Sequence, residues 1–84
     1  MRILNIAVDR VGTSRDGRNL LIGRGRDIVT GWAISFVVPA GERDRVLREV
    51  RGGRRPKVLV PEVNALPWAP VSGVAWERRR PSAF

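Results

Sequence analysis

The chain has 84 residues and room for one small domain, since a domain of this size buries only about 60% of the surface that its unfolded chain exposes. Its 16 basic and 8 acidic residues leave a formal charge of +8, and 43% hydrophobic residues are too many for a disordered basic tail. The absence of Cys and His excludes disulfides, the usual zinc ligand sets and the commonest general base, so we expect a folded domain that acts by binding, without catalysis, metal or cofactor.

The first predicted strand covers residues 2–10, where Leu4, Ile6 and Val8 alternate with more polar residues. This period of two is typical of a half-buried strand. Asp16-Gly17 follows, and Asp-Gly before a new apolar run indicates a turn. We therefore expect a hairpin whose second strand runs over residues 18–23.

Residues 23–26 read as a glycine-rich link to a third strand that starts at Ile28 and ends at Val38, before Pro39. Neither face of residues 28–38 carries a charge, which predicts a central strand covered on both sides. Gly31 in its middle indicates a bulge or a close approach of another backbone. Trp32 and Phe36 share one face and are expected in the core.

Residues 42–51 read as a short helix, with acidic residues at its start, arginines near its end and Gly52-Gly53 as its stop signal. Its narrow apolar stripe predicts packing on the sheet, because ten residues are marginal as an isolated helix. The fourth strand is expected at 57–60 and the fifth at 71–76, where Trp76 is expected in the core. Three prolines keep the segment between them irregular.

The predicted order is β-β-β-α-β-β, an α+β domain that is mainly β. This order resembles the oligonucleotide/oligosaccharide-binding barrel in its architecture. A strongly bent antiparallel sheet with one short helix gives the same order, so a five-stranded barrel and an open sheet both fit. We expect one domain over residues 1–77 and a flexible basic tail over 78–84.

Two short stretches carry seven of the eight net positive charges. Residues 51–60 hold four basic side chains and no acid, and residues 78–84 hold three. Arginine offers a planar donor fork that suits phosphate, and each phosphate contact releases counterions from a nucleic acid. The predicted phosphate-binding residues are Arg51, Arg54, Arg55, Lys57, Arg78, Arg79 and Arg80. The alternative is that these charges only keep a small protein soluble.

Trp68 is the predicted stacking residue of this site, because it stands between Pro67 and Pro70 in a segment that does not read as a buried strand. An exposed Trp can stack on any base. The alternative is that Trp68 folds back over the end of the small core.

The leading hypothesis is a small binding module for DNA or RNA. The competing hypothesis is a small protein of the phage or mobile-element type that docks on an acidic surface of one host protein and inhibits or redirects it. A homodimer through an exposed strand edge is compatible with both hypotheses.

No membrane contact is expected. The longest uncharged stretches, 28–41 and 63–76, have fourteen residues each, whereas a membrane-spanning helix needs about 20. The apolar run 3–8 is also shorter than the roughly 7–15 residue core of a secretory signal. We therefore expect a cytoplasmic protein.

Overall fold

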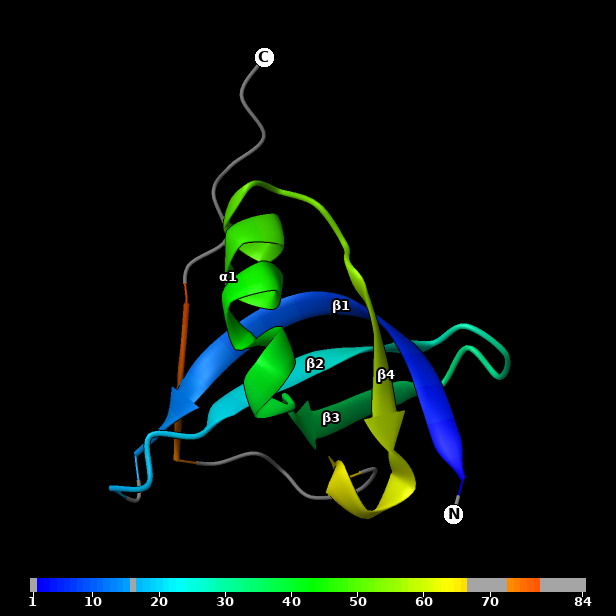
Figure 1. Cartoon of the computed structure of the whole chain (residues 1–84), viewed down its shortest axis with the longest axis horizontal. Helices are drawn as coiled ribbons and strands as arrows, with labels where there is room; N and C mark the ends of the chain where they lie inside the picture. Colours follow the sequence, from blue (N-terminus) through cyan, green and yellow to red (C-terminus); the bar gives the residue numbers. More distant parts are fainter. Residues whose placement is uncertain (1, 16, 67–72, 78–84) are drawn as a thin grey trace.

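The computed structural model describes residues 2–15, 17–66 and 73–77 (Figure 1). In these residues the chain forms one antiparallel sheet, a short α-helix and two single turns of 3₁₀ helix. The elements in chain order are β1 (Ile3–Ser14), β2 (Leu21–Asp27), β3 (Ala33–Val37), η1 (Ala40–Glu42), α1 (Arg43–Arg51), β4 (Lys57–Pro61), η2 (Glu62–Asn64), β5 (Ala65–Leu66) and β6 (Val74–Trp76). Neither α1 nor any other helix in the described ranges has the length and hydropathy to cross a bilayer.

The mainly β class, the single short helix and the β-β-β-α-β-β order are confirmed, with the two-residue β5 as an addition. The sheet has the order β4-β1-β2-β3-β5, and β6 pairs with the second half of β1. Of the two architectures that the sequence left open, the bent open sheet is the one that forms. The closed barrel is wrong, since the outermost strands β4 and β5 are not paired with each other.

The edge of β4 that faces away from β1 shows a physical reason why the sheet of the described residues ends there. The Val8 N–H donates to the Pro56 carbonyl at 2.8 Å, so alternation along the strand turns the backbone groups of Lys57 and Pro61 away from β1. Pro61 has no N–H to offer, and the Lys57 carbonyl already accepts a hydrogen bond from Arg45 Nη2 at 3.0 Å. Both ends of this edge therefore resist the addition of another strand.

The core lies between the concave face of the sheet and α1, which Figure 1 shows beside the long, curved β1. Phe36 is fully buried at its centre, as expected. From the helix, Val46 is fully buried and Leu47 and Val50 pack around it. Burying one such side chain contributes about 1.5–3 kcal/mol, which holds a helix too short to persist alone.

The helix ends as the sequence predicts. Gly53 has φ +81°, its N–H donates to the Val50 carbonyl at 3.0 Å, and the Arg54 N–H donates to the Glu49 carbonyl at 2.9 Å. This is the Schellman arrangement, in which a residue in the left-handed region reverses the chain and satisfies the last carbonyls of the helix.

The predicted third strand is wrong over residues 28–32. Asp27 Oδ1 accepts hydrogen bonds from the N–H groups of Val29 at 2.8 Å and Thr30 at 3.3 Å, which makes a turn, and Gly31 has φ +77°. In this turn Val29 is 86% exposed and Trp32 66% exposed, so Trp32 is not a core residue. The local hydrogen bonds of the Asp side chain outweigh the apolar pattern.

Other boundaries differ as well. Residues 23–26, expected as a link, lie inside β2, and β1 continues to Ser14. Of the expected fifth strand, residues 74–76 form β6, and residues 71–72 lie outside the described ranges. Trp76 pairs with Gly12 on the face of the sheet turned away from the core, so its expected core position is also wrong.

Candidate functional site

A β-bulge in the middle of β1 organises the face of the sheet that is turned away from α1, called the outer face below. Val8 and Val11 are both buried in the core although three positions separate them. Strict alternation cannot bury both. The pairing with β2 therefore slips between Val8 and Arg10, and Asp9 becomes the extra residue. As a result, Asp9 and Arg10 both lie on the outer face.

The strands next to β1 add further basic side chains to this face. Residues that pair directly across an antiparallel sheet share a face. One row across the sheet joins Lys57, Ala7, Arg26 and Ala33. The next row joins Arg10, Arg24 and Ser35. We name as the outer basic face the residues Arg10, Arg24, Arg26, Arg55 and Lys57 together with Asp9.

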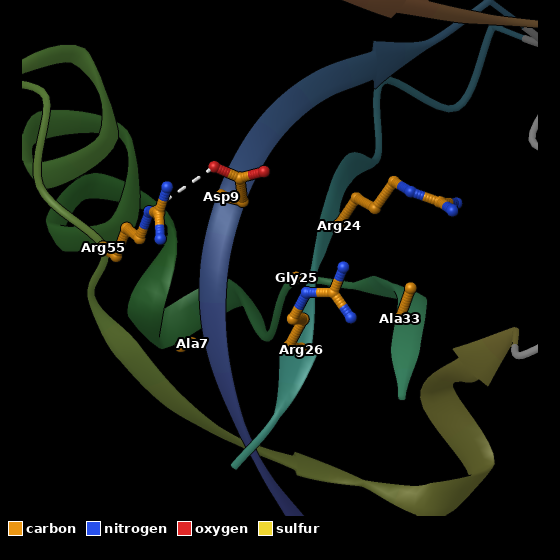
Figure 2. A pocket seen from close by; sticks show the side chains of 7 residues that line it. All are labelled: Ala7, Asp9, Arg24, Gly25, Arg26, Ala33 and Arg55. Atoms are coloured by element: carbon orange, nitrogen blue, oxygen red, sulfur yellow. Dashed lines mark ion pairs between the residues drawn. The ribbon is translucent and has the colours of Figure 1, made fainter. Parts of the chain in front are cut away.

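A hollow of about 370 Å³ lies on the outer basic face, and Figure 2 shows the residues around it. Its floor is formed by Ala7, Ala33 and the backbone of Gly25, and Ala7 and Ala33 lie on either side of Arg26 in one row of the sheet. A side chain on Gly25 would overlap the carbonyl oxygen of Ala7. The walls are charged and consist of Asp9, Arg24, Arg26 and Arg55.

Hydrogen bonds to neutral oxygens hold two of the guanidinium groups in place. Arg24 Nη1 donates to Ser35 Oγ at 3.0 Å, and Arg26 Nη1 donates to the Gly31 carbonyl at 2.9 Å. Both arginines are exposed. These contacts orient the side chains without neutralising them, so the remaining N–H groups and the full positive charge face solvent.

Of the residues predicted from the sequence, Arg55 and Lys57 belong to the outer basic face. Arg55 lines the hollow, and its Nε lies 3.7 Å from Asp9 Oδ1, an ion pair longer than a direct hydrogen bond. Lys57 is exposed in the row that contains Arg26.

Arg51 and Arg54 are instead each engaged by a carboxylate. Arg51 donates two hydrogen bonds to Glu77, at 2.9 and 2.8 Å, and Arg54 pairs with Glu49. The hydrogen bond from Arg51 lowers the pKa of Glu77 against the opposing effect of partial burial, and Glu77 in turn raises the pKa of Arg51. The hydrogen bond from Arg54 lowers the pKa of Glu49 in the same way. Trp68, Arg78, Arg79 and Arg80 lie outside the described residues.

Three residues of the outer basic face were not among the predicted site residues: Arg10, Arg24 and Arg26. The sequence does contain a signal for Arg10. The apolar residues stand at even positions up to Val8, whereas the next one, Val11, stands at an odd position, which indicates an extra residue between them. The alternation of Arg24 and Arg26 with glycines is a second signal, since it fits a strand with one charged face. This signal was missed because the two glycines favoured the interpretation of residues 23–26 as a link.

Comparisons with models of protein families, with curated proteins and with solved structures find no match to this chain. The chemistry of the outer basic face is therefore the basis for a functional proposal. Guanidinium and ammonium groups donate hydrogen bonds and carry positive charge, so this face can hold anions.

Proposed function

We propose that this protein is a non-catalytic module that binds nucleic acid, DNA or RNA, through the outer basic face. The observation that supports this proposal is the placement of five basic side chains from four segments on one face of the sheet, where three of them and the carboxylate of Asp9 line one hollow. A groove or face of this kind neutralises several phosphates at once and releases their counterions.

The arrangement favours an extended polyanion over a single anion. The basic groups follow the rows of the sheet from Lys57 at the β4 edge to Arg24 and Arg26 on β2, and Arg10 extends them toward Trp76. Paired strands lie about 4.8 Å apart, so the row from β4 to β2 spans about 10 Å. Successive phosphates of one strand can meet different basic groups over this distance.

Fluorescence anisotropy with labelled single-stranded and duplex oligonucleotides, at several salt concentrations, tests the proposal. We expect binding that weakens steeply with salt. The double substitution Arg24→Gln and Arg26→Gln should weaken binding about a hundredfold or more, since hydrogen bonds to charged groups contribute about 1.5–3 kcal/mol each. It should also reduce the salt slope for a single strand by about 1.4, at roughly 0.7 per phosphate contact.

The matched control is Arg43→Gln with Arg48→Gln, which removes the same charge from α1 on the other side of the sheet. This control should weaken binding much less. A second comparison uses Arg51→Gln with Arg54→Gln, whose guanidinium groups are already paired with carboxylates. Equal losses in all three variants would show that net charge alone drives binding, and no binding at low salt would refute the proposal.

A second candidate function, docking on a host protein, is supported by a different observation. Six large hydrophobic side chains are exposed in the described ranges, and all come from segments at one end of the sheet. At this end β1 begins, β4 ends and β2 turns into β3. The six residues are Ile3, Ile28, Val29, Trp32, Leu59 and Val63. Exposed apolar patches often mark protein interfaces. A pull-down from nuclease-treated lysate separates the two functions, since one persistent protein partner that Val29→Ser and Trp32→Ser release together would favour docking.

A further inference from the structure

Phosphate binding gives no role to the carboxylate of Asp9, which pairs with Arg55 on the outer basic face. It lines the same hollow as Arg24, Arg26 and Arg55, and its side chain is 42% exposed. A negative charge among phosphate-binding groups repels phosphate and weakens binding. The bulge in β1 nevertheless places this carboxylate on the face that carries the basic groups.

The hollow therefore offers two kinds of hydrogen-bonding partner. The carboxylate of Asp9 only accepts hydrogen bonds, through two oxygens, whereas the guanidinium groups of Arg24, Arg26 and Arg55 only donate them. Figure 2 shows Asp9 and Arg55 on the β1 side of the hollow and Arg24 and Arg26 on the β2 side. A ligand that satisfies both sides must present donors on one edge and acceptors on another.

Guanine has this pattern. Its N1–H and N2–H₂ groups are neighbouring donors that match the two oxygens of a carboxylate. Its O6 and N7 atoms are neighbouring acceptors that match the fork of an arginine. Adenine and the pyrimidines lack the pair of neighbouring donors next to an acceptor pair of this kind.

The floor of the hollow also suits a planar base. Ala7 and Ala33 rise little above the backbone of the sheet on either side of Arg26, and Gly25 adds only backbone, so a ring can lie over this floor beside the Arg26 side chain while its edges reach the charged walls. A volume of about 370 Å³ has room for one base with its sugar outside.

We propose that the hollow reads an unpaired guanine, with Asp9 accepting from N1–H and N2–H₂ and an arginine of the β2 side donating to O6 and N7. This inference rests on the proposed function and specifies its ligand. Since base pairing occupies N1–H and N2–H₂ of guanine, the ligand is single-stranded nucleic acid.

The test compares the wild-type protein on labelled twelve-nucleotide thymidine strands that carry one central guanine, hypoxanthine or adenine. We expect the guanine strand to bind about tenfold more tightly than the adenine strand, which corresponds to one bidentate contact. Hypoxanthine lacks the N2 amino group, so the affinity for its strand should lie between the affinities for the guanine and adenine strands. Equal affinity for all three strands would overturn the inference and leave the proposed function standing.

The variant Asp9→Asn gives the second readout. It should lose most of the preference for guanine while it binds the adenine strand more tightly, because the repulsive charge is gone. The matched control Asp44→Asn, on α1, makes the same charge change and should keep the preference. A uniform gain of affinity for all strands in Asp9→Asn would show that Asp9 acts only through its charge and would overturn the inference. Absence of binding to every strand would overturn the proposed function as well.

Discussion

The guanidinium carbon of Arg10 lies 5.2 Å from the centre of the Trp76 ring. Arg10 is the second residue of the β1 bulge, and Trp76 is the last residue of β6, which pairs with β1 beside Gly12. A side chain at Gly12 would come within 2.6 Å of Val74 Cγ1, so the missing Cβ lets β6 approach. The cation–π contact thus joins the bulge to the strand that extends the sheet.

Loss of this contact should lower stability measurably. We expect Arg10→Gln to reduce the free energy of unfolding by about 0.5–1 kcal/mol, the contribution of an exposed cation–π pair. A double-mutant cycle with Trp76→Leu, measured by urea unfolding, isolates the contribution of the pair. If the two single effects simply add, the contact does not stabilise the fold.

Glycine should be required at position 25, because a Cβ there would overlap the carbonyl oxygen of Ala7 and push β1 away from β2. We expect Gly25→Ala to destabilise the protein by about 2 kcal/mol or more, as strained core substitutions do. Gly41→Ala is the control, since a Cβ at position 41 meets nothing within 4 Å. Thermal unfolding of both variants decides the matter, and similar midpoints would contradict the close approach of β1 and β2.

Deletion of Asp9 should be tolerated, although it lies within a strand. Without this residue Val8, Arg10 and Val11 alternate regularly, so both valines stay in the core and Arg10 stays outside. Deletion of Ala7 should unfold the protein, because it turns Leu4 and Ile6 to the solvent side. Far-UV circular dichroism and urea unfolding compare the two deletions. An equal loss of stability in both would argue against a bulge at Asp9 as the reason why the alternation breaks between Val8 and Val11.

The ion pair of Arg51 and Glu77 should make the free energy of unfolding depend on pH in the acidic range. Arg51 holds the pKa of Glu77 below its ordinary value of about 4.3 in the unfolded chain. The contribution of the pair is therefore present above that unfolded value and is lost as the pH falls through the lower folded pKa. Glu77→Gln should be less stable than the wild type at pH 7, and the difference should shrink below about pH 4. A difference that stays constant from pH 7 to pH 3 would contradict this linkage.

Much of the local structure can be read directly from the sequence, because its causes are local. Alternating apolar residues predict the first half of β1, and the acidic start, apolar stripe and glycine pair predict α1 almost to the residue. The mainly β class and the element order follow from these patterns. The signal of the bulge is also local, since the spacing of Val8 and Val11 breaks the alternation.

The candidate site depends on contacts between residues far apart in the chain. Arg51 and Arg54 look equivalent to Arg55 in the sequence, but Glu77, 26 residues away from Arg51, engages the first and Glu49 engages the second. Arg24 and Arg26 become part of the site only because β2 pairs between β1 and β3 and turns both side chains to the outer face. Charge and periodicity are properties of single segments, whereas the partner of each charge is decided by which strands and helix ends the packing of the core brings together.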